Sequence, residues 1–138
     1  MDIKFADKDL TTQKARGFIN VKLNGVPQTT DQVTLYSFGD GKGGIIAGLG
    51  ATPAGLTYMI SLGYPARDKI KPIVHFPEDY SDPYSPWTFN WNSGAHYYAV
   101  KGTLELTNEN LPNSATGKFS FTTEGGSEVT GDFYLVAF

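Results

Sequence analysis

Apolar and polar residues alternate along the C-terminal third of the chain. From Tyr98 to Leu106, apolar residues or glycine occupy every second position, and lysine, threonine and glutamate stand at the intervening positions 101, 103 and 105. Successive side chains of a β-strand point to opposite faces, so this period of two predicts a strand with one buried face and one wet face. Related patterns at Gly117–Thr123 and Val129–Phe138 extend the prediction to an all-β protein.

Further strand candidates recur at short intervals, separated by clusters of glycine, proline, asparagine and aspartate. No segment carries sustained apolar residues at helical spacing. The pair Asn24-Gly25 predicts a tight turn after the second strand, because these residues adopt positive φ most readily. The expected strands are Ile3–Ala6, Phe18–Leu23, Val33–Phe38, Ile45–Leu49, Leu56–Leu62, Pro72–Phe76, Tyr97–Thr107, Gly117–Thr123 and Val129–Phe138.

The last strand differs from the others because both of its faces are apolar. Phe133, Leu135 and Ala137 share one face, whereas Tyr134, Val136 and Phe138 share the other. This pattern is typical of a central strand that is covered on both sides, or of a strand whose second face meets a partner. The second interpretation predicts a homo-oligomer that associates through Tyr134, Val136 and Phe138.

The strand pattern predicts one domain over residues 1–138, which is long enough to bury a core without disulfides. About nine short antiparallel strands with hairpin connections are typical of a β-sandwich or a β-barrel. The alternation is compatible with both architectures, and we expect the sandwich, with a closed or partly open barrel as the alternative.

Composition narrows the function classes. The chain has no cysteine, which excludes disulfides, thiolate catalysis and cysteine-based zinc sites. Its net charge of −3 comes from interspersed signs, so no basic stripe predicts nucleic-acid binding. No apolar stretch approaches the roughly 20 residues of a membrane helix. The first residues lack the apolar core of a signal peptide, so the chain is expected to be either cytoplasmic or a trimmed mature form.

Three features together resemble a known family. They are an early strand that ends in an Asn-Gly turn, a strand opening Gly102-Thr-Leu-Glu-Leu-Thr, and the closing pattern Gly117-Lys-Phe-Ser-Phe followed by Gly131-Asp-Phe-Tyr-Leu. In order and spacing they resemble small bacterial all-β domain proteins of unknown function, best represented by surface lipoproteins of Bacteroidetes. The resemblance covers most of the chain and implies an architecture, but no catalytic residue.

No motif predicts an enzyme, a cofactor or a transition metal. The GxGxxG string at Gly39–Gly44 is followed by Ile45–Gly50 and Pro53 in place of the helix that a dinucleotide site needs. The histidines are His75 and His96, without HxH or HExxH spacing, and no Gly-x-Ser-x-Gly elbow is present.

The acidic stretch at residues 78–82 offers a weaker candidate for calcium. Glu78, Asp79 and Asp82 could supply carboxylate oxygens, and backbone carbonyls could complete the shell. Surface acids in a solvated loop explain the same residues, and we expect that explanation.

The segment from Tyr80 to Tyr98 is the most unusual part of the chain, because aromatic residues alternate there with asparagine, serine and aspartate. Rings beside polar groups are what a sugar-binding surface needs, and the same composition suits a protein interface. The third interpretation is that Trp87, Phe89 and Trp91 form the core face of one strand. For a ligand site, the stacking groups would be Tyr84, Trp87, Trp91 and Tyr97, and the polar groups would be Asp82, Asn92 and His96.

Taken together, these patterns predict a non-catalytic binding or interaction module. Its ligand would be a carbohydrate or a protein partner recognised through this aromatic segment. The alternative is a barrel that carries a small apolar ligand inside.

Overall fold

The computed structural model describes residues 11–37, 43–51, 55–80, 87–92, 94, 96–110 and 113–137. They form nine strands and one 3-10 turn, η1, at Arg67–Lys69. The strands are β1 (Thr11–Leu23), β2 (Val26–Ser37), β3 (Gly44–Ala51), β4 (Thr57–Tyr64), β5 (Ile73–Phe76), β6 (Thr88–Trp91), β7 (His96–Asn110), β8 (Ser114–Thr123) and β9 (Glu128–Ala137).

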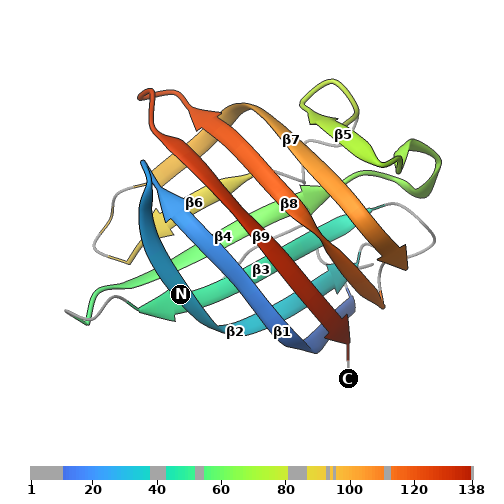
Figure 1. Cartoon of the computed structure of the whole chain (residues 1–138), viewed down its shortest axis with the longest axis horizontal. Coiled ribbons are helices and arrows are strands. Elements are labelled where there is room, and N and C mark those ends of the chain that lie inside the picture. Colours follow the sequence, from blue (N-terminus) through green and yellow to red (C-terminus); the bar gives the residue numbers. More distant parts are fainter. Residues whose placement is uncertain are drawn as a thin grey trace.

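The sheet closes into a barrel (Figure 1). Its order is β5-β7-β6-β4-β3-β2-β1-β9-β8, and a further pairing of β7 with β8 joins the ends of the ring. All the described strands except β5 belong to the ring, which therefore has eight strands. The all-β prediction is confirmed, but the favoured sandwich is not found, and the architecture is the barrel that was its alternative.

Closure depends on the length of β7. One edge of β7 pairs with β8 over most of its length, whereas its other edge pairs first with β6 and then with β5. A period of two assigns side chains to faces but carries no information about which strands meet at the edges. The alternating pattern therefore could not distinguish a closed ring from two packed sheets.

Most strand predictions agree with the structure in position. β1 and β2 extend well beyond the predicted segments, β6 was not predicted as a strand, and Ile3–Ala6 lies outside the described residues. The Asn24-Gly25 turn is confirmed, because both residues have positive φ, of 49° and 82°, and Leu23 pairs with Val26 across it.

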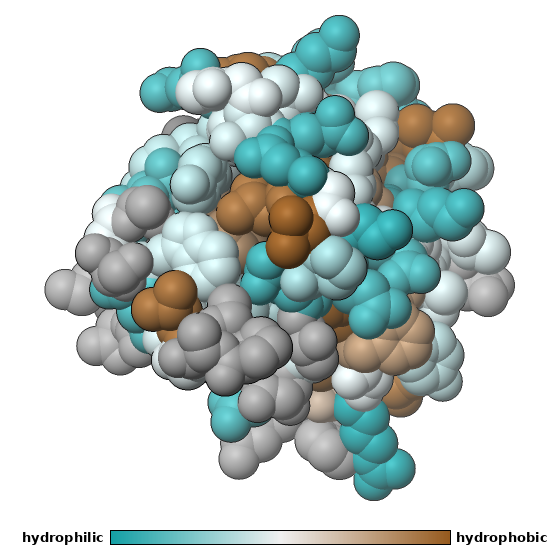
Figure 2. All heavy atoms as spheres, turned by 60° about the vertical axis from the view of Figure 1, so that its left-hand side comes forward, coloured by the Kyte–Doolittle hydropathy of each residue, from teal (hydrophilic) through white to brown (hydrophobic). Residues whose placement is uncertain are grey.

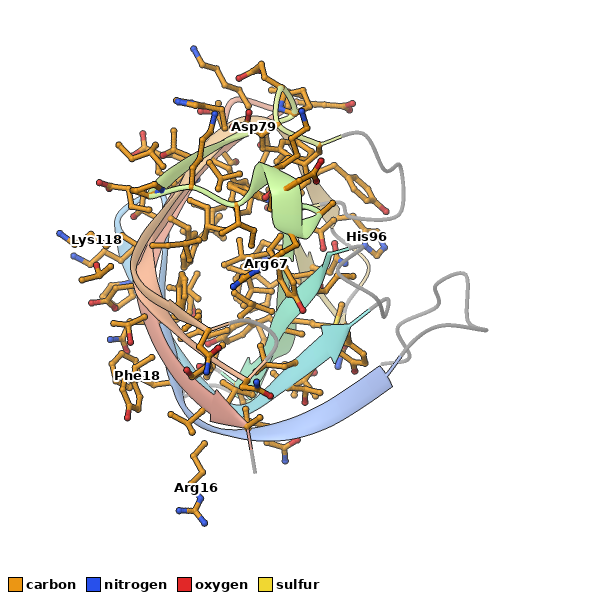
Figure 3. The ribbon with its side chains drawn as sticks, turned by 90° about the vertical axis from the view of Figure 1, so that its right-hand side faces the viewer. Arg16, Phe18, Arg67, Asp79, His96 and Lys118 are labelled. Carbon is orange, nitrogen blue, oxygen red and sulfur yellow. The ribbon has the colours of Figure 1, made fainter. Side chains whose placement is uncertain are left out.

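The inside of the barrel is filled by one apolar cluster, and the strands curve around it in Figure 3. Three of its aromatic rings lie over glycines. A Cβ at Gly102 would lie 2.6 Å from Trp87, and a Cβ at Gly117 would lie 3.1 Å from the ring of Phe133. The largest fully buried side chains are Trp87, Tyr58, Phe89, Phe121 and Phe133.

The third glycine, Gly131, lies beneath the ring of Phe119, its neighbour across β8 and β9. A Cβ there would come within 2.7 Å of Phe119 and would collide with the backbone oxygen of Asn20. The motif that carried the family resemblance is thus a packing device, in which glycines leave room for rings inside the barrel.

Burial on both faces occurs in β4 rather than in β9. Every residue of β4 after Thr57 is buried, whereas Tyr134 and Val136 on the outer face of β9 are exposed. The prediction of a last strand covered on both sides within the fold is therefore wrong, and Phe138 lies outside the described residues. Association with a second copy through this face stays a prediction.

Candidate functional site

Trp87, the first predicted stacking group, is part of the core. Its side chain is 1% exposed, and its indole Nε1 donates a hydrogen bond to the backbone oxygen of Gly63 over 2.8 Å. Its ring stacks on Phe76 with a centroid distance of 5.1 Å and meets Phe121 edge to face. A ring in this position stabilises the barrel and is not presented to a ligand in solution.

The same carbonyl of Gly63 also accepts a hydrogen bond from the Tyr80 hydroxyl, at 2.5 Å. Burial is the main reason why the pKa of Tyr80 is raised above its usual value. Tyr80 and Trp87 therefore hold the chain on both sides of residues 81–86 against the end of β4.

Trp91 and Tyr97 are half-buried. Trp91 meets Tyr58 and Phe89 edge to face, with centroid distances of 5.7 and 5.3 Å, and Tyr97 lies 6.3 Å from Phe89. Since Phe89 also pairs with Tyr97 between β6 and β7, these rings continue the core outward at this position.

Of the three predicted polar groups, Asn92 and His96 lie where β6 turns into β7. The backbone N–H of Asn92 donates to the backbone oxygen of Thr57 at 3.0 Å, and its side-chain amide donates to the Thr57 hydroxyl. His96 is exposed and stacks on the exposed Tyr98. Asp82 and Tyr84 lie outside the described residues. Binding at Trp91, Asn92, His96 and Tyr97 stays a prediction.

The loop acid Asp79 is used by the chain itself. Its carboxylate accepts hydrogen bonds from the backbone N–H of His75 at 2.6 Å and from Lys71 Nζ at 3.0 Å. The hydrogen bond from His75, followed by that from Lys71, holds the pKa of Asp79 below its usual value. Among the described residues, no group of three or more histidine, aspartate and glutamate side chains is arranged to hold a metal ion.

The outer face of β1, β9, β8 and β7 carries a second arrangement, which sequence reasoning did not single out. Register places polar side chains directly opposite one another in two parallel rows across these four strands. The first row is Lys22, Thr130, Ser120 and Thr103, and the second row is Asn20, Asp132, Lys118 and Glu105. Across the second row, the Asn20 side-chain amide donates a hydrogen bond to Asp132 at 2.9 Å.

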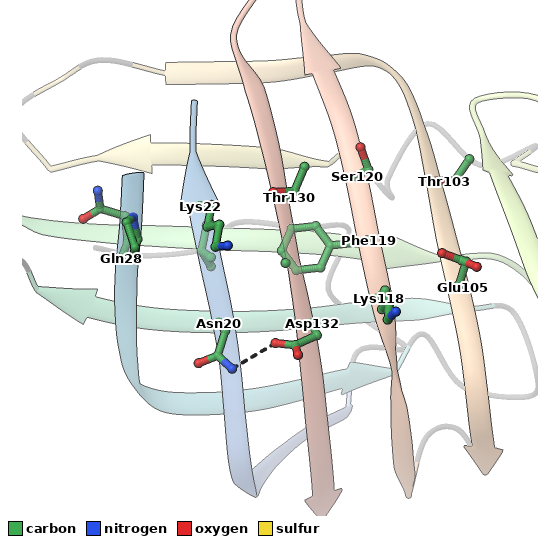
Figure 4. A pocket seen from close by; sticks show the side chains of 13 residues that line it. Asn20, Lys22, Gln28, Thr103, Glu105, Lys118, Phe119, Ser120, Thr130 and Asp132 are labelled. Carbon is green, nitrogen blue, oxygen red and sulfur yellow. Dashed lines mark hydrogen bonds between the residues drawn. The ribbon is translucent and has the colours of Figure 1, made fainter. Parts of the chain in front are cut away.

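These rows line an open hollow of about 610 Å³ (Figure 4). Its depth has a simple cause. Thr130, Ser120 and Thr103 have short side chains, whereas Lys118 and Glu105 beside them are long. The result is a trough that hydroxyl-bearing side chains line together with apolar groups such as Val21, Pro27 and Phe119, and charged groups of both signs stand beside it. We call it the polar hollow.

Two exposed aromatic rings stand next to the polar hollow. Phe18 and Tyr134 are paired between β1 and β9, are 42% and 46% exposed, and stack with a centroid distance of 6.3 Å. Phe18 and Lys118 point away from the barrel on the same side in Figure 3. A smaller hollow of about 280 Å³ adjoins these rings, and Lys118 and Asp132 line both hollows. We call it the aromatic hollow.

Alternation along β1 places Phe18 on this face, since Ile19 and Val21 are buried and the register of β1 with β9 is unbroken from Ala15 to Leu23. The other edge of β1 is irregular beside Phe18. The pairing of β1 with β2 shifts register between Ala15 and Asn20, and Thr30 Oγ1 fills the gap by accepting from the N–H of Ile19 at 3.0 Å and donating to its oxygen at 2.6 Å. Gly17, with φ of 122°, passes so close to Tyr134 that a Cβ would collide with the Tyr134 backbone oxygen. The outward ring of Tyr134 was visible in the sequence pattern, and alternation in the expected strand Phe18–Leu23 places Phe18 on the face opposite Ile19 and Val21. Only register brings Phe18 beside Tyr134.

Exposed apolar side chains elsewhere are scattered. On the side shown in Figure 2, brown areas are separated from one another by teal and white surface. Isolated exposed apolar residues are ordinary on protein surfaces. The stacked pair of Phe18 and Tyr134 differs from them because it lines the aromatic hollow, which shares Lys118 and Asp132 with the polar hollow.

Comparisons with protein-family models, with curated proteins and with solved structures find no match to this chain. In the part of the chain that the structure describes, no helix has the length and apolar character needed to cross a membrane.

Proposed function

We propose that this protein is a non-catalytic binding module that recognises carbohydrate on the outer face of β1, β9, β8 and β7. The observation that carries the proposal is that the exposed, stacked rings of Phe18 and Tyr134 line the aromatic hollow, which shares Lys118 and Asp132 with the polar hollow. Sugar rings present C–H groups on one face and hydroxyls at their edges, so they need this combination of partners.

The two parts of the site supply complementary interactions. Aromatic rings bury the apolar face of a sugar and are rigid, so little conformational entropy is lost on binding. The hydroxyls of Thr130 and Ser120 can each donate and accept hydrogen bonds, as sugar hydroxyls do. The volume of the polar hollow, about 610 Å³, lies within the range of small-molecule sites.

A protein partner, the other ligand class expected from the sequence, fits this face less well. Protein interfaces are closely packed at their centres, so a flat partner would leave the polar hollow to water. An internal carrier is also less well supported. An eight-stranded barrel can hold a small ligand only when side chains do not fill it, and a single apolar cluster that includes Trp87 and Phe89 occupies this interior.

The proposal is tested by screening the protein on a glycan array and measuring each hit by calorimetry for wild type, Phe18→Ala and Tyr134→Ala. Tyr98→Ala is the matched control, because Tyr98 is an equally exposed tyrosine on the outer face of the barrel away from the two hollows. We expect binding that both Phe18→Ala and Tyr134→Ala weaken by about tenfold or more and that Tyr98→Ala retains. An array without hits would contradict the proposal.

Loss of binding in Tyr98→Ala with retention in Tyr134→Ala would move the site to the turn that carries His96. Self-association would compete for the same face, because Tyr134 and Val136 belong to it. Light scattering at high protein concentration separates the two possibilities. A strict monomer is expected if the face is reserved for a ligand, and a dimer that Tyr134→Ala dissociates would show that a second copy covers it.

A further inference from the structure

We infer that the ligand of this face is an extended, neutral oligosaccharide of at least three sugar units, which runs along β9 and β8 and occupies both hollows. This inference rests on the proposed function, because it specifies the carbohydrate that the same face recognises. Three features of the face carry it: the continuity of the two hollows, the balance of its charges and the division between its aromatic and hydroxyl-bearing ends.

The two hollows form one continuous surface. Lys118 and Asp132 lie directly opposite each other on β8 and β9 and line both hollows. Along β9, the linings of the two hollows together run from Thr130 to Tyr134, which are four residues apart. At about 3.3 Å per residue this span is roughly 13 Å, which is longer than a single sugar ring. One monosaccharide therefore cannot span both hollows.

The charges on this face cancel. Two lysines, Lys22 and Lys118, oppose two carboxylates, Asp132 and Glu105, so their formal sum is zero. Lys118 lies between Asp132 and Glu105 in its row, so positive and negative groups alternate across the strands. A polymer with charges of one sign would meet like charges along this path, and such contacts lower affinity. A neutral chain with hydroxyl groups meets acceptors and donors without that penalty.

The ends of the site have different tasks. At one end, the rings of Phe18 and Tyr134 can stack on the face of a sugar, which contributes affinity with little demand on its hydroxyl pattern. At the other end, Thr130 and Ser120 lie opposite each other and line the polar hollow, so their side chains can offer hydroxyl groups to a ligand there. Between the ends, the hydrogen bond from Asn20 holds the Asp132 carboxylate in position for hydroxyl contacts. The aromatic end therefore contributes affinity for any sugar ring, and the hydroxyl-bearing end discriminates between sugars with different hydroxyl patterns.

The experiment is a length series measured by calorimetry. The probes are gluco- and manno-oligosaccharides of one to six units, with galacturonic acid oligosaccharides as the acidic series. We expect the affinity of a neutral series to rise by about tenfold or more between one and three units and then to level off. The acidic series is expected to bind more weakly at every length.

Two variants test whether the rise in affinity with the number of sugar units comes from the polar hollow. Ser120→Gln fills the hollow with a longer side chain, and Thr122→Gln is its matched control, two residues along the outer face of β8 and outside the lining of either hollow. Ser120→Gln should retain single-sugar binding and lose the gain with length, whereas Thr122→Gln should retain both. Tyr134→Ala should weaken binding at every length.

The outcomes separate this inference from the proposed function. A single sugar that binds as tightly as the longest chain, or an acidic series that binds more tightly than the neutral ones, overturns the inference and leaves carbohydrate binding intact. A protein that binds no sugar of any length overturns both. A gain with length that persists in Ser120→Gln contradicts the assignment of the third unit to the polar hollow.

Discussion

Two aromatic regions of this barrel point in opposite directions. In the segment from Trp87 to Tyr97, the rings of Trp87 and Phe89 are buried in the core, and Trp91 and Tyr97 continue that core outward. On β1 and β9, Phe18 and Tyr134 stack on the outer surface. The first region is dense in sequence and stabilises the fold. The second joins residues far apart in sequence and borders two hollows.

This contrast teaches that the density of aromatic residues in a sequence reports little about ligand access. Aromatic residues at every second position give a strand a core face. Inside the barrel such a ring packs over a glycine of a neighbouring strand, as Trp87 packs over Gly102. A ring that can stack on a ligand, in contrast, must occupy a strand position at which alternation points the side chain away from the barrel. Tyr134 satisfies that condition, and register with β1 adds Phe18.

We expect the largest loss of stability when a ring in the core is removed. Trp87→Ala should lower the free energy of unfolding by about 3–5 kcal/mol, because it removes a fully buried ring and its hydrogen bond to Gly63. Urea denaturation measures the loss. Trp91→Ala, at a half-buried tryptophan, is the control and should cost less. Equal costs for the two variants would contradict the distinction between a core ring and a ring at its margin.

The next effect concerns the packing of rings over glycine. Gly131→Ala should destabilise the fold by about 3 kcal/mol, because its Cβ would collide with the Asn20 backbone and press on Phe119. Gly125→Ala is the control, since a Cβ at that turn position meets nothing within 4 Å. Thermal unfolding of both variants distinguishes them. If Gly131→Ala is as stable as wild type, β1 and β9 are packed less closely at this position than the collision with the Asn20 backbone implies.

The third effect concerns the hydrogen bonds from Thr30 to the β1 backbone next to Phe18. Thr30→Val removes the hydroxyl that bonds both backbone groups of Ile19 and should cost about 1–2 kcal/mol, because these buried groups lose their partner. Thr30→Ser keeps the hydroxyl and is the control. Since Ile19 follows Phe18, the valine variant should also weaken carbohydrate binding. If Thr30→Val is as stable as wild type in urea, the Thr30 hydroxyl does not stabilise the part of β1 that carries Phe18.

The smallest effect is a pH dependence at the β5 turn. Because the pKa of Asp79 is lowered in the folded protein, its contribution to stability is present above the usual carboxyl pKa of about 3.9 and is lost as the pH falls through the lower folded pKa. Asp79→Asn should therefore cost less than about 1 kcal/mol at pH 7, since the ion pair with Lys71 faces solvent.

The difference between wild type and Asp79→Asn should vanish in strong acid, as measured by urea denaturation at several pH values. The neighbouring exposed acid supplies the control, and Glu78→Gln should have no comparable effect. A difference for Asp79→Asn that persists unchanged at the lowest pH would exclude the carboxylate as its source.

The local features of this fold could be predicted from the sequence. The all-β class, the Asn24-Gly25 turn and the inward positions of β8 and β9 follow from alternation and turn chemistry, which act over a few residues. Closure did not follow, since it depends on which edge of β7 meets β8. β6 was also missed. Of the three interpretations of its aromatic segment, the core face of a strand describes Trp87 and Phe89.

The candidate site was less accessible to sequence reasoning for the same reason. Its polar rows join one residue from each of four strands, and only register brings Asn20 beside Asp132 or Lys118 beside Glu105. Each of these residues looks like an ordinary wet-face position in its own strand. Tyr134 stood out because its strand is apolar on both faces, and that signal led to self-association as the expected role.

Carbohydrate binding on the outer face of β1, β9, β8 and β7 can be located residue by residue. Amide chemical shifts, followed by NMR during titration with the best-binding neutral oligosaccharide, test it most directly. If the ligand binds this face, the shifts should change along β9 from Thr130 to Tyr134 and at Phe18 and Lys118, and the indole N–H of Trp87 should stay unchanged. Shifts confined to the indole of Trp87 and the turn that carries His96 would contradict binding on this face.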